Sequence, residues 1–532
     1  MIEKYYSGVI EQIYNRIGKE TRNIVMANYS NDFSIENLEV IRRYQSNEDN
    51  VFFAYSEFSY NTLIGAYEPF LDIICNMHRR FIGGSFDDFQ KECGVYYLHR
   101  QVLNSYYETG ECFREEMVLL NEVAYEQRRM TMAIADMLKR LSEVKPLMIV
   151  INRFQMASKS SIETIKYLID NPCANIGIVL GVNALVKGAD STLEVWDSIV
   201  ESLEDRSAVY YIGSAGQLKN TVKTTNDDEM YITMNFEQSI QEASNIMEFL
   251  DFEQAKRGCR IIEHKLKFED AWIDEKSLRR FYMVYARTSV LLGEMSKAIE
   301  LTNEFKALIP ENDSEHYLSL YYFMKGTCYM YQGKLEKAGN SAKSAYDYAV
   351  LAEDDILIFK AELLSVMIKM SGWYNIFFCV QDIPVSDEII EKLIKHGYRN
   401  YLAHIYIYAY DNSRDVVKQS FYDESLLKHF TKGLELAKEI GNEKLVYDAY
   451  QKTIMLASTS GLNEIAFLYV IRTYEFMKGH GNIYVARELS SIGYNLSAMG
   501  KNELVDDYYN AAINMFYYPV SYTHLRAHET GR

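Results

Sequence analysis

The chain has 532 residues, 48% of them hydrophobic and 24% charged, with a formal net charge of −18 at pH 7. This length and composition predict a globular protein of roughly two to four domains. The chain contains only 6 Pro and 27 Gly but 44 Tyr, and this composition favours a largely helical protein. The acidic charge argues against nucleic-acid binding by this part of the chain, because a negative surface repels phosphate backbones.

The cysteines and histidines do not indicate a metal site. The seven cysteines are scattered and form no C-x-x-C pair, and the histidines lack metal-ligand spacing. Scattered reduced thiols are typical of a cytoplasmic protein. No signal peptide is found, and no apolar run approaches the length of about 18 residues that suggests a membrane span. We therefore expect a cytoplasmic protein that does not contact membranes.

The first half alternates strand patterns with helical patterns. Five short apolar runs are rich in branched or aromatic residues and predict strands, at 23–27, 51–55, 147–151, 176–182 and 208–212. The stretches between them predict helices, at 34–44, 61–80, 113–143, 159–169 and 191–203. Such alternation is typical of βαβ units with a parallel sheet. We expect an α/β domain over 1–215 and a linker over 216–235.

Residues 27–34 (ANYSNDFS) follow the first strand, where an α/β nucleotide-binding domain has its phosphate-binding loop. Against the pattern G-x-x-x-x-G-K-[ST], Ala27 and Asp32 stand at the Gly positions, Phe33 at the Lys, and Ser34 alone matches. Phe33 cannot neutralise phosphate, and Asp32 repels it by roughly 1–4 kcal/mol at about 4 Å. Taken alone, the octet fits an ordinary strand-to-helix turn with Ser34 as the N-cap better than a phosphate-binding loop.

A second polar pair follows the strand at 147–151. In an ATPase this position carries two acidic residues, which hold Mg²⁺ and orient a water. Here Asn152 has an oxygen but no charge, and Arg153 would repel Mg²⁺, although it could contact an anion. Both halves of the site are thus impaired. We predict no catalytic residue, no metal and no required cofactor; ATP could bind without being hydrolysed. The vestigial nucleotide site would comprise Ala27, Asp32, Phe33, Ser34, Asn152 and Arg153.

Residues 127–169 resemble the middle of the STAND-class P-loop ATPase (AAA-type) domain of large bacterial LuxR-type, MalT-like regulators. The chain keeps that family's Pro146-Leu147, Gln155, Ala157 and the helix that follows. It has Asn152-Arg153 for the acidic pair, Met156 for a Trp and Ser158 for an Asp. Residues 51–74 also resemble the family's second strand and next helix. The resemblance covers 1–215 and implies a degenerate P-loop domain in a signal-responsive transcription regulator.

From residue 236 the pattern becomes a helical repeat. LGEMSKAIE (292–300) and QGKLEKAGN (332–340) align as G-x-x-x-K-A, and LDFEQAKRG (250–258) would be a first copy. Turn glycines recur every 39 or 40 residues, at Gly293, Gly333 and Gly372, and again at Gly461 and Gly500. This period predicts repeats that resemble tetratricopeptide (TPR) repeats, as a solenoid over 236–518. The Gly would end a helix at positive φ, and Ala298 and Ala338 would let paired helices pack closely.

The role of the tyrosine-rich segments stays open, and the last residues are excluded from the prediction. The tyrosine-rich segments 317–333 and 401–412 would fill the repeat core, which we favour, or line a concave groove for a ligand. Residues 519–532 break the helical pattern and resemble translated sequencing-adapter DNA, so we exclude them from fold prediction. On that interpretation the natural protein continues beyond Tyr518.

Three functions compete, which we rank in the order given. The first is a regulatory switch, in which the repeats bind a protein or small-molecule effector and a missing C-terminal helix-turn-helix domain binds DNA. That DNA-binding part is implied only by the family resemblance. The second is a scaffold that binds partner proteins through its repeats, and self-association is also open. The third is an ATPase with a non-standard site; we predict that the chain is not an enzyme.

Overall fold

The structure is a computed structural model. It describes residues 2–29, 38–46, 50–58, 63–114, 116, 118, 120, 122–183, 209–211, 235–268, 273–371, 387–409, 424–478 and 482–517. The predicted site residues Asp32, Phe33 and Ser34 lie outside these ranges, as do Gly372, the predicted helix 191–203 and the tail 519–532. The chain divides into two compact units, Met1–Ala361 and Glu362–Arg532, which we describe separately.

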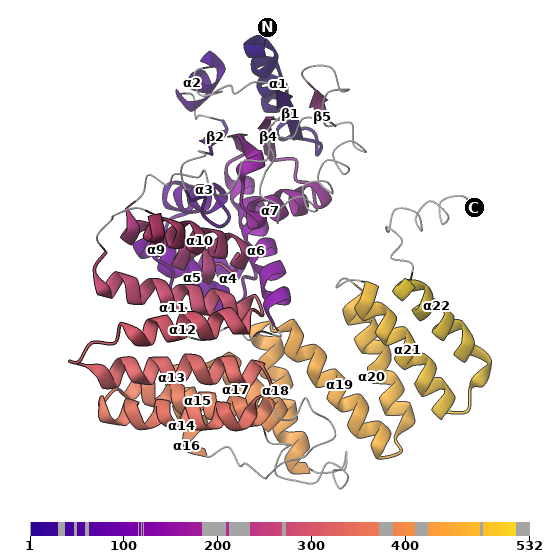
Figure 1. The fold of residues 1–532 in the computed structure, drawn as a ribbon. Coiled ribbons are helices and arrows are strands. Elements are labelled where there is room, and N and C mark those ends of the chain that lie inside the picture. Colours follow the sequence, from indigo (N-terminus) through magenta and orange to yellow (C-terminus); the bar gives the residue numbers. More distant parts are fainter. Residues whose placement is uncertain are drawn as a thin grey trace. The chain divides into compact units, whose positions relative to one another are not determined.

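A parallel sheet forms the amino-terminal part of the first unit (Figure 1). Its order is β2-β3-β4-β1-β5, and every neighbouring pair is parallel. The first strand runs two residues beyond its predicted end at Ala27. The continuous apolar run Leu147–Ile151 is fully buried, as expected for a strand covered on both faces. The strands are β1 (Ile24–Tyr29), β2 (Phe52–Glu57), β3 (Leu147–Asn152), β4 (Ile176–Asn183) and β5 (Val209–Tyr211), which confirms all five predicted strands.

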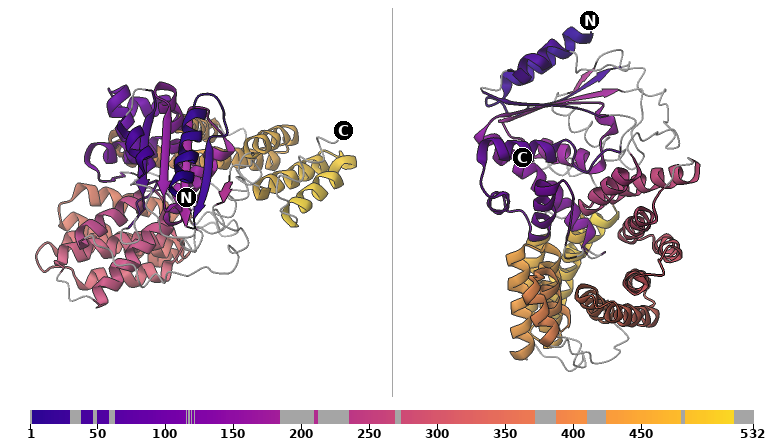
Figure 2. Two further views of the ribbon diagram at one scale, coloured as in Figure 1. Left: turned by 90° about the horizontal axis from the view of Figure 1, so that it is seen from above. Right: turned by 90° about the vertical axis from the view of Figure 1, so that its left-hand side faces the viewer.

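Helices cover the sheet on both sides. The right-hand view of Figure 2 shows α1 (Ile2–Arg16) on one face and α6 (Val123–Val144) with α7 (Lys159–Asp170) on the other. Gly177 of β4 allows the close approach of α1, because a Cβ there would lie 2.8 Å from the Ile17 side chain. The other helices in the described part of this domain are α2 (Glu39–Ser46), α3 (Phe70–Met77), the π-helix η1 (His78–Ile82), α4 (Phe86–Glu92), α5 (Tyr97–Thr109) and the 3₁₀-helix η2 (Phe154–Met156).

Two predicted helices begin later than expected. The helix predicted from 61 begins at Phe70, because Pro69 disfavours helical conformation in the residue before it. The helix predicted from 113 begins at Val123. The described residues between Glu111 and Glu122 are not helical, since their polar groups bond to other elements instead of to each other.

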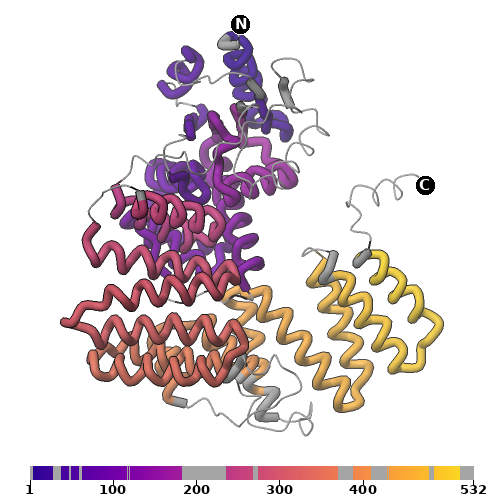
Figure 3. Tube along the Cα trace, viewed as in Figure 1, coloured from indigo at the N-terminus to yellow at the C-terminus, as the bar shows by residue number. Residues whose placement is uncertain are grey.

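Helical hairpins make up the rest of the first unit, visible as paired rods in Figure 3. Ala298 and Ala338 are fully buried, in agreement with their predicted role in close helix packing. The parallel α/β domain followed by TPR-like hairpins confirms the predicted fold class. The hairpins pair α9 (Phe236–Glu248) with α10 (Phe252–Phe268), α11 (Glu275–Leu291) with α12 (Met295–Ala307), and α13 (Ser314–Tyr331) with α14 (Leu335–Leu351), while α15 (Asp355–Ser371) crosses the unit boundary.

One kind of turn ends the helices of both units. At Gly293 (φ 78°) the N–H of that residue donates to Val290 O, and the next N–H donates to Ser289 O. This pair of bonds is the Schellman motif, which satisfies the last carbonyls of a helix. The same bonds occur at Gly333, Gly397, Gly441, Gly461 and Gly500, and at Leu250 and Glu353, which adopt positive φ without being glycine.

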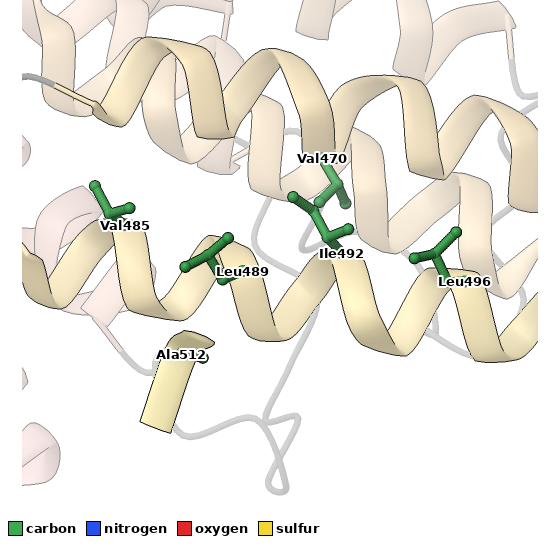
Figure 4. Packing of buried hydrophobic residues seen from close by; sticks show 6 residues of the cluster. All are labelled: Val470, Val485, Leu489, Ile492, Leu496 and Ala512. Carbon is green, nitrogen blue, oxygen red and sulfur yellow. The ribbon is translucent and has the colours of Figure 1, made fainter. Parts of the chain in front are cut away.

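The second unit is entirely helical in its described residues. Figure 4 shows its core, where Val470 of α20 meets Val485, Leu489, Ile492 and Leu496 of α21, and Ala512 of α22. Among the described residues of the whole chain, no helix is long and apolar enough to cross a bilayer. The elements are α16 (Asp387–His396), α17 (Arg399–His404), the π-helix η7 (Ile405–Ala409), α18 (Glu424–Ile440), α19 (Glu443–Thr459), α20 (Asn463–Met477), α21 (Asn482–Ala498), the 3₁₀-helix η9 (Asn502–Leu504) and α22 (Val505–Tyr517).

The positive φ at these turns predicts that losing a glycine there destabilises the chain and that gaining one stabilises it. Gly333→Ala should destabilise the chain by about 1–2 kcal/mol through φ alone, because its Cβ would meet nothing within 4 Å. Glu353 is exposed and adopts φ 53°, so Glu353→Gly should stabilise the chain by about 1 kcal/mol. Gly339→Ala is the control: inside α14 and without positive φ, it should stabilise by about 1 kcal/mol. Denaturant unfolding measures all three, and a stabilising Gly333→Ala would contradict the assignment.

Candidate functional site

Three of the six predicted nucleotide-site residues, Ala27, Asn152 and Arg153, lie in the described part of the chain. β4 separates β1 from β3, so these two strands are roughly 10 Å apart, two strand spacings. Ala27 lies within β1, paired with Gly181 of β4, and its carbonyl accepts a 2.8 Å hydrogen bond from the Tyr6 hydroxyl. This alanine, placed at the first loop position by the sequence pattern, is therefore a buried strand residue.

Asn152 ends β3, and Arg153 follows the strand. Asn152 is fully buried, and its carbonyl accepts a 3.2 Å hydrogen bond from the N–H of Phe58. Arg153 adopts φ 55° and starts the short helix η2. Its Nη1 lies 3.3 Å from Glu57 Oε1, and the two side chains are only 20% and 16% exposed. The cation at the position predicted for a catalytic acid is thus paired with a carboxylate.

Glu57 was not among the site residues predicted from the sequence. The residue ends β2, directly beside Asn152 in the parallel register. Glu57 could have been found only by knowing that its strand lies next to β3. The alternation of strands and helices in the sequence does not reveal the order of the strands in the sheet. An Arg153–Glu57 pair offers an incoming phosphate less net positive charge than an unpaired arginine would, because the carboxylate lies within salt-bridge distance of the guanidinium.

The helix after this edge is tied to the first repeat hairpin. Ser158 caps α7 and accepts from the N–H of Ser161 at 3.4 Å. The carboxylate of Asp251, in the turn between α9 and α10, accepts from the N–H of Ser160 at 3.0 Å through Oδ2. Its Oδ1 accepts from the N–H of Gln254 at 3.3 Å, in the first turn of α10. One buried carboxylate therefore caps two helices, and it lies 91 residues from the Ser160 amide in the chain.

Neighbouring bonds complete this junction. The Ser160 hydroxyl accepts from the N–H of Tyr67 at 3.0 Å, and the Ser161 hydroxyl donates to the carbonyl of Glu68 at 2.7 Å. The Gln254 amide donates to the carbonyl of Ile64 at 2.9 Å. Burial raises the pKa of Asp251, while its bonds to Ser160 lower it. Helix N-termini stabilise a negative charge, so the carboxylate suits this position despite its burial.

Removing the shared cap should be costly. Asp251→Ala leaves Ser160 and Gln254 without their acceptor, and we expect a loss of about 2–4 kcal/mol, the sum of two caps. Glu253→Ala is the matched control: it loses a partly exposed 3.2 Å ion pair with Lys159, which contributes about 1 kcal/mol or less. Denaturant unfolding measures the stability of both variants. Equal losses of stability would contradict the role given to Asp251.

An acidic pocket of about 240 Å³ lies where α3, α5 and α9 meet. Its walls include the aromatic rings of Tyr106 and Phe249 and three carboxyl groups, those of Glu68, Asp72 and Glu242. The Tyr106 hydroxyl donates to Asp72 Oδ1 at 3.1 Å. Burial, with Glu68 nearby, raises the pKa of Glu242 from 4.5 to about 7. Among the described residues, no group of acidic, histidine or cysteine side chains has the geometry of a metal site.

This raised pKa predicts a pH dependence of stability. Between pH 4.5 and about 7 the folded chain keeps a proton on Glu242 that the unfolded chain has lost, so raising the pH destabilises the folded state. Glu242→Gln removes this effect. The stability of that variant relative to wild type should rise by up to roughly 3 kcal/mol across the window. Denaturant unfolding at several pH values measures it, and a constant difference would contradict the assignment.

Comparisons with known proteins find similar structures and no sequence match. No protein-family model matches the chain, and no curated protein is significantly similar to it. A STAND protein with a tetratricopeptide repeat sensor from Pyrococcus horikoshii is 12% identical and covers 94% of this chain and 87% of its own, with a TM-score of 0.41. A Rap protein in complex with Competence and Sporulation Factor is 16% identical over 53% of this chain and 76% of its own, at 0.37.

A third similar structure is the apo form of the quorum sensor NprR from B. thuringiensis. It is 10% identical and covers 61% of this chain and 93% of its own, with a TM-score of 0.27. At these identities and TM-scores, the similarities carry no weight for function. The fold class is supported by the parallel strand order and by the hairpins with their shared turn.

Proposed function

We propose that this chain is the switch and sensor part of a cytoplasmic, signal-responsive regulator. Its repeats bind an effector, and the α/β domain transmits the binding event. The observation that carries the proposal is the double cap at Asp251, because the same carboxylate holds the first repeat hairpin and the helix that follows Asn152 and Arg153. A displacement of the hairpin must therefore change the sheet edge where a nucleotide would bind.

The nucleotide site contributes structure and not hydrolysis in this proposal. Asn152 brings no charge for Mg²⁺, and Arg153 with its partner Glu57 occupies the position where water would be activated. ATP could still bind at the sheet edge as a ligand. The regulated output would be transcription, through a LuxR-type DNA-binding domain. The strongly acidic chain supports the view that DNA contacts lie elsewhere.

Turnover assays test the nucleotide part. The purified chain should release no phosphate from Mg-ATP above background, and Asn152→Asp alone should not restore release, because Arg153 remains beside the metal position. Phosphate release is the measurement, with wild type and Asn152→Ala as the matched pair. Hydrolysis by wild type that Asn152→Ala abolishes would show that the chain is an ATPase.

The regulatory role is tested in the organism that encodes the chain. Deleting the gene should change the level of a defined set of transcripts. Complementation with wild type or with Glu253→Ala should restore that set, whereas Asp251→Ala, at matched protein level, should not. Transcript profiling measures the outcome. Unchanged transcripts in the deletion strain, with partner proteins still captured through the repeats, would favour a scaffold over a regulator.

A further inference from the structure

The connection between α5 and α6 lies against the first helices of three successive hairpins. It joins two helices of the α/β domain, yet its described residues bond to α9 and α13 and line one pocket together with residues of α11. We call residues 110–120 the inserted segment, and we refer only to its described members. All the residues that it contacts belong to the first unit of the chain.

Two side chains of the repeats hold the backbone of the inserted segment. The Asn245 amide of α9 donates to the carbonyl of Gly110 at 3.1 Å and accepts from the N–H of Cys112 at 2.9 Å. The Tyr331 hydroxyl of α13 accepts from the N–H of Leu120 at 3.1 Å. Bonds of this kind bind an extended backbone whatever its side chains are, as a neighbouring strand would.

Arg114 is the charged anchor of the inserted segment. It is 7% exposed; its Nη2 donates to the carbonyl of Glu248 at 2.8 Å, and its Nε lies 3.6 Å from Glu248 Oε2. Arg287 of α11 lies 2.9 Å from the other oxygen of the same carboxylate. A guanidinium that leaves water this completely needs such a partner, so Glu248 selects for a basic side chain at this position.

Val118 is the apolar anchor. It is 5% exposed and lines a pocket of about 30 Å³ together with Met247 of α9, Val290 of α11 and Met324 of α13. By contrast, Phe113 is 63% exposed. The basic anchor is therefore followed four positions later by an apolar one, with fully buried Glu116 between them, and Leu120 is bound through its backbone.

We propose that this face of α9, α11 and α13 is a peptide-binding groove, which the inserted segment occupies as an internal ligand. The effector would be an extended peptide with a basic residue followed four positions later by an apolar one. This inference rests on the proposed function and deepens it by stating the chemical class of the effector. Displacing the segment would act on α6, which leads directly into β3 and Asn152.

A peptide added in trans tests the groove. The probe is a labelled peptide of residues 109–123, and binding is followed by fluorescence anisotropy. In wild type the tethered segment competes at an effective concentration on the order of millimolar. The chain with Arg114→Ala should therefore bind the wild-type peptide at least ten times more tightly than the wild-type chain does. The chain with Phe113→Ala should behave as wild type, and a peptide with Arg114→Ala should bind neither chain.

Folding is controlled separately from binding. Circular dichroism and thermal unfolding show whether the Arg114→Ala chain is folded, and a folded chain with no gain in affinity overturns the proposal. Hydrogen exchange on wild type needs no variant: the amides of Cys112 and Leu120 should exchange through an opening that leaves α9 protected. If the amides of Cys112 and Leu120 exchanged only when α9 also opened, the inserted segment would be a fixed part of the fold, and the proposal would be overturned. The transcript test above stands or falls independently of both results.

Discussion

Two helix N-termini converge on one buried carboxylate, and the organisation of the first unit depends on that convergence. A helix N-terminus carries unpaired N–H groups and a partial positive charge. Asp251 satisfies α10, the helix of its own hairpin, and α7, the helix behind β3, at the same time. If the first repeat hairpin moves away, α7 loses this acceptor, whereas α10 keeps its own cap. The repeats therefore begin at a fixed place beside the sheet, instead of following it on a tether.

The same junction links the chemistry of the sheet edge to the repeats. β3 ends at Asn152, the chain turns through Arg153 in a left-handed conformation, and α7 begins two residues after Ala157. In an active ATPase this stretch would respond to the γ-phosphate through Mg²⁺. Here Arg153, at the position that the sequence predicted for an acidic residue, pairs with Glu57 instead. In the proposed switch, a signal that reaches α7 through Asp251 needs no hydrolysis.

Much of the fold could be predicted because its signals are local. Buried strands such as Leu147–Ile151 appear as continuous apolar runs, and Gly293 and Gly333 mark helix ends that need positive φ. The turns at Leu250 and Glu353 have no glycine at this position. The turns at Gly397 and Gly441 are not followed by the K-A pair of the G-x-x-x-K-A pattern. The sequence pattern alone therefore does not locate every turn.

The site could be predicted only in part, because its decisive contacts are distant in sequence. Asn152 and Arg153 were found at the end of a strand, as expected. Glu57 depends on strand order, and Asp251 lies 91 residues from the amide that it caps. The inserted segment was predicted as helix from residue 113 onward. Its backbone instead bonds to Asn245 and Tyr331, residues more than 100 positions away, and such competition with local helix formation is invisible in a sequence window.

Native-state hydrogen exchange at the two amides bound by Asp251 tests the central claim most directly. If the first repeat hairpin and the sheet edge open as one unit, the N–H groups of Ser160 and Gln254 should exchange with the same free energy and the same denaturant dependence. Independent openings, with one amide exchanging freely while the other stays protected, would show that the first repeat hairpin and the sheet edge are not coupled.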